Sequence, residues 1–246
     1  MKFSRLPRIY ANISLIKSNS LNITEDNNHY LQKVLRLKIG DQFRIFNGVD
    51  GEFIAQITNM TKNNLSILLT DILRQPLIED ADQIILGISL IKTDRMLDAV
   101  NMAVQLGVTK IVPIIAERSQ YRSINEQKLL KIIIEATEQC ERLNPPILAL
   151  PTSLEVFVKS TPDITLLYAN EHEHKYCTML EAADKITYTA LDISIIVGPE
   201  GGFSPNELEL FASQPHAISF SLGANILRTE TAVATCLAQY ALLGRW

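Results

Sequence analysis

The first 75 residues alternate short apolar runs with turn-forming dipeptides. The runs cover residues 43–46, 52–57 and 65–69, and Asn-Gly, Asp-Gly and Asn-Asn dipeptides lie between them. Those dipeptides supply the positive-φ residues that β-hairpins need. Apolar residues also recur at helical spacing over 30–35, before Gly40. The pattern therefore predicts a small β-barrel or sandwich that carries one helix.

The strand pattern is interrupted at 74–82, and beyond this segment the spacing of apolar residues changes, so that apolar strands alternate with helical stretches. This rhythm is typical of a mostly parallel α/β sheet, so we predict two domains, residues 1–75 and 76–246. The expected strands span 84–90, 110–115, 147–150, 164–168, 194–197 and 217–221, and the expected helices span 94–106, 125–142 and a last stretch that ends at Leu243. Ligands of such sheets bind beyond the carboxyl ends of the strands, here the loops after Tyr168, Val197 and Ser221.

Composition places the 246-residue chain among ordinary globular proteins, with 47% hydrophobic and 20% charged residues. The apolar runs fall far short of the roughly 20 residues that cross a bilayer, and no apolar segment follows the basic first ten residues. Cys140, Cys177 and Cys236 have unrelated spacings that fit neither a disulfide framework nor a zinc site. We expect a cytoplasmic protein with reduced thiols and no membrane association.

Charge is distributed unevenly along a chain whose net charge is -4. Residues 1–75 hold ten Lys and Arg against six Asp and Glu, a surplus of four. Residues 143–246 hold five against eleven, a deficit of six. Because phosphate binding needs local positive charge, the first domain is the better candidate for a nucleic-acid contact.

The sharpest motif runs from Gly198 to Glu207, reads GPEGGFSPNE and directly follows an apolar strand. Three glycines in five residues let the backbone approach a ligand closely. Ser204, Pro205 and Glu207 then form a helix-capping signal, with the serine as cap and the glutamate reaching back. The loop lacks both the lysine of a P-loop and the spacing of a Rossmann motif. A ligand loop and a plain strand-to-helix turn are both compatible with this spacing.

A second motif, Ser221 to Thr231, also follows a strand and opens a long apolar helix. Arg228 and Glu230 are the only charges between Glu209 and Arg245. Taken alone, Glu230 is a first-turn acid that complements the helix dipole, and Arg228 is its solvated partner.

Basic residues near the ends of elements form the third feature. Lys92 and Arg95 lie at the start of an expected helix, and Arg118 and Arg142 lie near the ends of other elements. Acidic residues are interspersed with them, so many of these charges fit a solvated helical face. Side chains at element ends can nevertheless converge on one ligand.

Other reaction classes have little support. His172, His174 and Cys177 make an unconvincing metal set, and a surface loop is the better interpretation. The lack of a Gly-x-Ser-x-Gly motif argues against hydrolase chemistry. We expect no metal ion.

Together these segments resemble the RsmE-type 16S ribosomal RNA (uracil-N(3))-methyltransferases of the SPOUT, or trefoil-knot, superfamily. The resemblance covers essentially the whole chain. Its motifs include LQKVLRL at 31–37, KTDRM at 92–96, VGPEGGF at 197–203 and ILRTETA at 226–232, and their order and spacing make the match specific. Residues 101–105 depart from the family, which commonly carries a lysine and a glutamate there. We therefore do not carry over RNA or dimer contacts at positions 101–105 of that helix.

The resemblance implies a PUA-like β-barrel joined to an α/β domain with a deep trefoil knot, acting as a homodimer on the small ribosomal subunit. Periodicity alone gives an unknotted doubly wound sheet, so the knot comes from the resemblance. The resemblance also implies that S-adenosyl-L-methionine lies bent between three loops and is held mostly by backbone groups. The residues expected to contact it are Leu167, Tyr168, Ala169, Asn170, Gly198, Pro199, Glu200, Gly201, Gly202, Leu222, Gly223, Ile226, Leu227 and Arg228.

The implied reaction transfers a methyl group to ring nitrogen 3 of a uridine in 16S ribosomal RNA. That nitrogen carries a proton and faces its pairing partner, so the base must be exposed, deprotonated and aligned. Arg228 is expected to stabilise negative charge on a uracil oxygen, and Glu200 or Glu230 to take the proton or hold Arg228. The candidates for RNA contacts are Arg5, Arg8, His29, Arg36, Arg95, Arg118 and Arg142.

Two alternatives stay open at this point. One is a knotted methyltransferase with another RNA target, and the other is a catalytically silent RNA-binding protein. The silent protein is disfavoured, because a binding module does not need both glycine loops. The apolar last helix, 232–243, is the candidate dimer surface.

Overall fold

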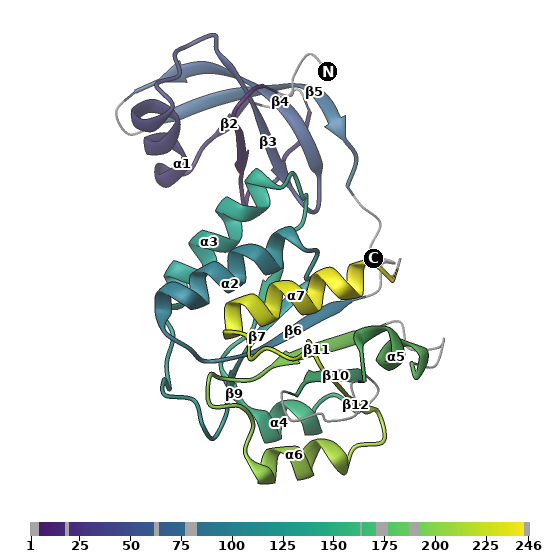
Figure 1. Cartoon of the computed structure of the whole chain (residues 1–246). Coiled ribbons are helices and arrows are strands. Elements are labelled where there is room, and N and C mark those ends of the chain that lie inside the picture. Colours follow the sequence, from purple (N-terminus) through teal and green to yellow (C-terminus); the bar gives the residue numbers. More distant parts are fainter. Residues whose placement is uncertain are drawn as a thin grey trace. The chain divides into compact units, whose positions relative to one another are not determined.

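The computed structural model describes residues 5–17, 20–61, 64–76, 83–162, 164–170, 177–186 and 192–243 (Figure 1). The chain divides into unit 1, residues 1–79 with 137–145, and unit 2, residues 80–136 with 146–246. The predicted boundary after residue 75 lies beside residues 77–82, which fall outside the described residues. A single cut at that point leaves 137–145 in the second domain, whereas by contacts this segment groups with the first.

Unit 1 is built on a five-stranded sheet with the order β1-β3-β4-β5-β2 among its described residues. The strands are β1 (Arg8–Tyr10), β2 (Ser20–Asn22), β3 (Gln42–Asn47), β4 (Gly51–Met60) and β5 (Leu65–Arg74). β1 and β3 run parallel, and the other pairings are antiparallel. The helical segment is α1 (Glu25–His29), which continues as a π-helical turn, η1 (Tyr30–Val34).

The core of unit 1 follows the period of its strands. In β5, buried Leu65, Ile67 and Leu69 alternate with half-buried residues, as expected for a strand with one face on the core. Phe43 and Leu31 are fully buried in the same cluster. The predicted strands over 43–69 are confirmed, and β4 and β5 are longer than expected.

Unit 2 contains a parallel sheet whose described strands have the order β12-β10-β11-β6-β7-β8, with β9 beside β7. The strands are β6 (Ile84–Ser89), β7 (Lys110–Ile115), β8 (Ile147–Leu148), β9 (Thr152–Ser153), β10 (Thr165–Ala169), β11 (Ile193–Val197) and β12 (Ala217–Phe220). β6 and β11 are buried at every position, because the sheet is covered on both faces. The predicted parallel α/β sheet is confirmed. The expected strand 147–150 is two short strands instead, and Pro151 between them has no N–H to donate to a ladder.

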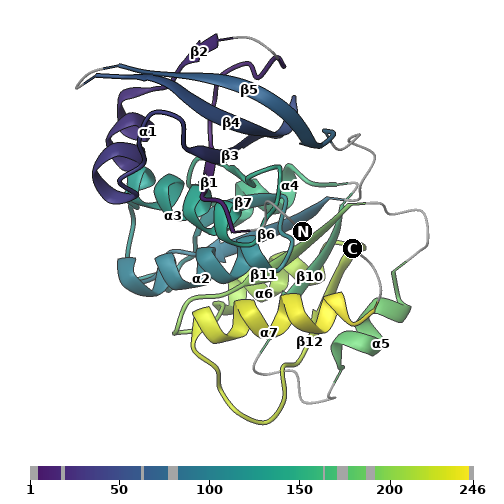
Figure 2. The ribbon, with the colours of Figure 1, turned by 90° about the horizontal axis from the view of Figure 1, so that it is seen from above.

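Helices cover both faces of this sheet. They are α2 (Thr93–Gln105), α3 (Glu126–Gln139), α4 (Leu154–Lys159), α5 (Met179–Asp184), α6 (Pro205–Ala212) and α7 (Thr229–Ala241). α2 and α7 pack side by side on one face, while α4 and α6 pack together on the other (Figures 1 and 2). α3 ends at Gln139 rather than at the predicted 142, because Glu141 already has a left-handed backbone with φ 62°.

Candidate active site

A pocket opens in unit 2 beyond the carboxyl ends of β10, β11 and β12, the position at which parallel sheets bind ligands. Its walls come from three loops and from the first turns of α7. The lining residues are Ala169, Asn170, Val197, Gly198, Pro199, Gly202, Phe203, Leu222, Gly223, Asn225, Ile226, Leu227, Thr229 and Ala232.

The glycine loop after β11 is a tight turn that local chemistry specifies. The amide of Gly202, at φ +66°, donates to the carbonyl of Pro199 at 2.9 Å, a backbone conformation that favours glycine. A Cβ atom at Gly198 would lie 3.2 Å from the ring of Phe203, so a larger residue there crowds a buried ring. The predicted cap is confirmed, because Ser204 Oγ accepts from the amide of Glu207 at 3.1 Å and heads α6.

The loop after β7 holds the glycine loop at two points. The carboxylate of Glu207, only 5% exposed, accepts from the amides of Glu117 and Ser204, both at 2.8 Å. Arg118 Nη1 donates to the carbonyl of Gly201 at 3.0 Å. Arg118, expected to contact RNA, thus also fixes the outer side of the glycine loop.

The hydroxyl of Thr229 links the remaining pocket walls. It donates to the carbonyl of Gly198 at 3.1 Å and so ties the first turn of α7 to the loop after β11. The amide of Asn170 donates to the carbonyl of Phe220 at 2.9 Å and extends the pairing of β10 and β12 into the pocket rim. The three loops therefore form one hydrogen-bonded frame.

The two acids expected to act in catalysis meet at one arginine. Arg95 Nη1 in the first turn of α2 lies 3.0 Å from Glu200 Oε1, and Arg95 Nε lies 3.9 Å from Glu230 Oε1. Glu200 and Glu230 directly follow the pocket residues Pro199 and Thr229. Arg95 is among the expected RNA contacts, and its half-buried guanidinium is instead shared by these carboxylates.

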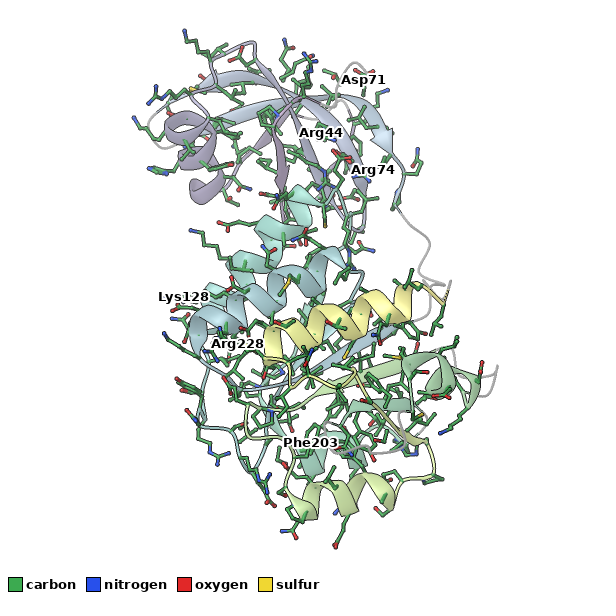
Figure 3. The ribbon with its side chains drawn as sticks, viewed as in Figure 1. Arg44, Asp71, Arg74, Lys128, Phe203 and Arg228 are labelled. Atoms are coloured by element: carbon green, nitrogen blue, oxygen red, sulfur yellow. The ribbon has the colours of Figure 1, made fainter. Side chains whose placement is uncertain are left out.

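Arg228 precedes the first helical residue of α7 and has an extended backbone, at φ -68° and ψ 152°. Its side chain is exposed and has no hydrogen-bond or ion-pair partner in the described part of the chain (Figure 3). A guanidinium in this position beside the pocket is free to meet a substrate.

Most of the residues expected to contact the cofactor line the pocket. They are Ala169, Asn170, Gly198, Pro199, Gly202, Leu222, Gly223, Ile226 and Leu227. Glu200, Gly201 and Arg228 lie beside lining residues rather than in the lining, and Leu167 is buried within β10. The ring of Tyr168 stacks on Phe211 in the core, with centroids 4.2 Å apart, and so has a packing role.

Five lining residues were not among the expected cofactor contacts: Val197, Phe203, Asn225, Thr229 and Ala232. Asn225 lies within the predicted loop after Ser221, so it could have been predicted as a pocket residue. Thr229 and Ala232 reach the pocket only because α7 starts directly at its wall, which no periodicity encodes.

Arg8 does not have the accessible side chain that an RNA contact requires. It is 8% exposed, and its Nε lies 3.1 Å from Oε1 of the buried Glu52. The rest of its guanidinium donates to the carbonyls of Thr137, Glu138 and Arg142 at 3.0, 3.2 and 2.6 Å. Burial lowers the pKa of Arg8, and the nearby Glu52 carboxylate opposes that shift. Arg8 is therefore a structural residue of unit 1.

The other expected RNA contacts are placed differently. Arg5, His29 and Arg36 are exposed on unit 1, and Arg118 is exposed on unit 2. Arg142 is half-buried, and its burial lowers the pKa of its guanidinium. Arg36 has φ 56°, a left-handed backbone that usually favours glycine.

The donor set of the pocket fits an adenosine-type cofactor. Val197, Phe203 and Ala232 offer apolar surface for a flat base, and the side chains of Asn225 and Thr229 are polar groups of the kind that bind ribose or an amino acid. No cluster of His, Cys, Asp and Glu suited to a metal ion occurs among the described residues, and His172 and His174 lie outside them. In the same part of the chain, no helix combines the length and apolarity needed to span a bilayer.

Two family models match the two parts of the chain. A model described as an RNA methyltransferase domain matches residues 79–241, and one described as an RNA methyltransferase PUA domain matches residues 23–70. A curated relative from Rickettsia conorii, named ribosomal RNA small subunit methyltransferase E, is 46% identical over 99% of this chain and 97% of its own length.

Solved structures show the same likeness over nearly the full length. A methyltransferase from Legionella pneumophila, in complex with bound S-adenosylmethionine, has a TM-score of 0.85 at 30% identity and covers 97% of this chain and 98% of its own. Ribosomal RNA small subunit methyltransferase E from Neisseria gonorrhoeae, also bound to S-adenosylmethionine, has a TM-score of 0.83 at 25% identity, with coverage of 97% and 98%.

Proposed function

The chain belongs to the ribosomal RNA small subunit methyltransferase E family, and on that basis we propose that it methylates ring nitrogen 3 of one uridine in 16S ribosomal RNA. It is an S-adenosylmethionine-dependent ribosomal RNA methyltransferase with an N-terminal PUA-like domain and a C-terminal methyltransferase domain. The observation that supports the finer proposal is the pocket beyond β10, β11 and β12, whose loops carry both glycine motifs and end beside Arg228 and two acids.

Backbone groups of Gly198, Gly202 and Leu222 would hold the cofactor, with Asn225 and Thr229 as side-chain partners. When bound, S-adenosylmethionine supplies a methyl group made electrophilic by a positively charged sulfur. The hydrogen-bonded frame of the three loops keeps these groups in place before the cofactor arrives, and such preorganisation lowers the cost of aligning the reactants.

Arg228 would act on the uracil ring. Removing the N3 proton places negative charge on the neighbouring carbonyl oxygens, and the exposed guanidinium beside the pocket, which has no partner among the described residues, can stabilise it. This role belongs to the transition state, since the neutral base carries little charge. Arg5, His29 and Arg36 on unit 1 and Arg118 on unit 2 would meet phosphates or bases of the same RNA.

The partners of the proposed reaction follow from the family. We place the enzyme in the cytoplasm, acting on 16S ribosomal RNA within the small subunit, as a homodimer and without a metal ion. The apolar face of the last helix, which was expected to form the dimer surface, is largely buried within the chain itself, at Val233, Cys236 and Leu237, so the homodimer is proposed from the family resemblance. The trefoil knot stays part of the proposal.

Methyl transfer to purified ribosomal subunits tests this function. Small subunits from cells that lack the modification would be incubated with the protein and methyl-labelled S-adenosylmethionine, and the 16S RNA digested to nucleosides for mass spectrometry. Label in 3-methyluridine supports the proposal. Label in another nucleoside or another RNA favours the different-target alternative, and cofactor and RNA binding without any label favours the silent protein.

A further inference from the structure

Two carboxylates stand at the edge of the cofactor pocket, and they are not equivalent. Glu200 Oε1 receives a hydrogen bond from Arg95 Nη1 at 3.0 Å, so its charge is paired directly. Glu230 Oε1 lies 3.9 Å from Arg95 Nε, too far for a hydrogen bond. Arg95 therefore has Glu200 as its principal partner and acts on Glu230 through charge alone.

One carboxylate oxygen of Glu230 receives no hydrogen bond from the described residues. Its Oε2 atom is buried and has no hydrogen-bond partner among the described residues, although the side chain as a whole retains 15% exposure. An unpaired buried acceptor is costly, and in native structures it usually marks a ligand, a water or a catalytic role. Because no hydrogen bond from the described residues fixes either oxygen, the carboxylate can turn about its last bond to present one to a ligand.

Resting on the proposed function, we infer that Glu230 is the base that removes the N3 proton of the target uridine and that Arg95 is its positioning residue. A uridine N3–H is the kind of donor that a carboxylate with a free oxygen accepts. Glu230 follows Thr229, which lines the pocket, and its carboxylate shares Arg95 with Glu200, which follows the lining residue Pro199. Glu200 then serves as the counter-ion that anchors Arg95.

Proton removal from N3 and methyl transfer to N3 take place in one step. The N3 proton passes to a carboxylate oxygen of Glu230, and the nitrogen pair that it leaves forms the bond to the methyl carbon. The pair of the broken carbon–sulfur bond stays on sulfur, whose charge falls from positive to neutral. Glu230, now a neutral acid, returns its proton to water, and Arg95 favours the charged carboxylate for the next turnover.

Arg228 and Glu230, the two charged residues at the start of α7, thus have different roles. Arg228 has no carboxylate partner among the described residues and can stabilise a uracil oxygen, whereas Glu230 is supported by Arg95 from α2. The expectation that Glu230 holds Arg228 has no support in the described contacts, because neither a hydrogen bond nor an ion pair joins the two side chains.

Glu230→Gln tests the inference, with RNA containing either uridine or 5-fluorouridine at the target. Glutamine keeps the shape but cannot take a proton, so the methylation rate should fall about a hundredfold or more. Fluorine makes N3–H more acidic, so the variant's defect should shrink at least about tenfold on the fluorinated RNA, while cofactor binding by calorimetry stays unchanged. Glu209→Gln, at an exposed acid of α6, is the matched control and should leave both rates unchanged.

Arg95 is tested by the same pair of substrates. Arg95→Met should lower kcat with little change in KM for RNA, with partial recovery on 5-fluorouridine, and Arg95→Lys should lie between Arg95→Met and the native protein. A second variant, Glu230→Asp, retains a proton acceptor and should keep more activity than Glu230→Gln.

Three results would overturn the inference. They are a Glu230→Gln rate within about threefold of the native rate, an equal defect on both RNAs, or loss of cofactor binding in that variant. Each leaves the proposed function standing if the native protein still forms 3-methyluridine. Failure of the native protein to methylate any small subunit overturns the proposed function itself.

Discussion

The hydroxyl of Thr229 donates to the carbonyl of Gly198 at 3.1 Å, and this single bond joins the start of α7 to the glycine loop. Thr229 is 3% exposed, so water cannot replace the bond easily. Both residues line the pocket. The geometry of the cofactor site therefore depends on a contact between two segments that lie 31 positions apart.

Thr229→Val should weaken cofactor binding with little loss of fold. Valine has nearly the same shape but leaves the Gly198 carbonyl without its donor, at a cost of about 1 kcal/mol, or roughly fivefold in the dissociation constant. Calorimetry with S-adenosylmethionine measures this. Thr231→Val, at an exposed position of the same helix, is the control and should bind normally. Equal affinities for all three proteins would show that the bond does not shape the pocket.

Arg228→Ala should lower the methylation rate far more than it weakens cofactor binding. A contact to charge that develops only in the transition state contributes about 3 kcal/mol, roughly a hundredfold in rate. The side chain is exposed and has no partner in the described part of the chain, so stability should not change. Single-turnover kinetics beside calorimetry separate the two effects. Equal losses of rate and affinity would reassign Arg228 to cofactor binding.

The order of elements was readable from the sequence because hydrophobic period and turn residues act locally. Ser204 and Glu207 predict the start of α6 for the same reason, because the capping contact joins residues only three positions apart. The grouping of 137–145 with unit 1 and the burial of Arg8 were not readable. Both depend on contacts between distant positions: the Arg8 guanidinium meets backbone carbonyls more than a hundred positions away and the carboxylate of Glu52, 44 positions away.

For the site residues too, local features could be predicted from the sequence, whereas contacts between distant residues could not. Loops that follow strands could be identified, so most pocket residues were expected correctly by position. The pairing of Arg95 with Glu200 and Glu230 could not be predicted, because these acids approach from two other elements and the sequence around Arg95 gives no sign of them. Side-chain contacts between different helices and strands cannot be predicted from a single sequence.

Glu52→Gln should strongly destabilise unit 1. Glu52 is 1% exposed and pairs with Arg8, Arg44 and Arg74, of which Figure 3 labels Arg44 and Arg74. Removing the Glu52 carboxylate leaves the buried guanidinium of Arg8 without a counter-charge, which typically costs about 3–5 kcal/mol. Urea unfolding measures the change. Glu141→Gln is the control, because that side chain is 53% exposed and its pair with Arg44 should contribute less than about 1 kcal/mol.

Stability should also depend on pH through Glu141. The hydrogen bond and charge of Arg44 hold the pKa of Glu141 below its ordinary value of 4.5. A carboxyl with a lowered pKa in the folded state stabilises the fold above its unfolded pKa, and this contribution is lost as pH falls through the folded pKa. Native protein should therefore lose slightly more stability than Glu141→Gln between about pH 5 and pH 3. Parallel pH curves for the two proteins would contradict this.

RNA binding should involve the exposed basic residues of unit 1. Replacing Lys33 and Arg36 by glutamine should reduce the slope of log affinity against log salt by about 0.7 to 0.9 for each phosphate that these side chains neutralise in the native protein. A salt series with a 16S RNA fragment measures the slope. Lys128→Gln, at an exposed position of α3 in unit 2, is the control. An unchanged slope in the double variant, with a reduced slope in the control, would move the RNA surface to the methyltransferase domain.

Mass mapping of 16S ribosomal RNA from cells with and without this protein is the decisive test of the proposed methylation. We expect one 3-methyluridine that disappears when the gene is removed and returns with the native protein, but not with Arg228→Ala or Glu230→Gln. A complete set of 3-methyluridines in cells that lack the protein would contradict it.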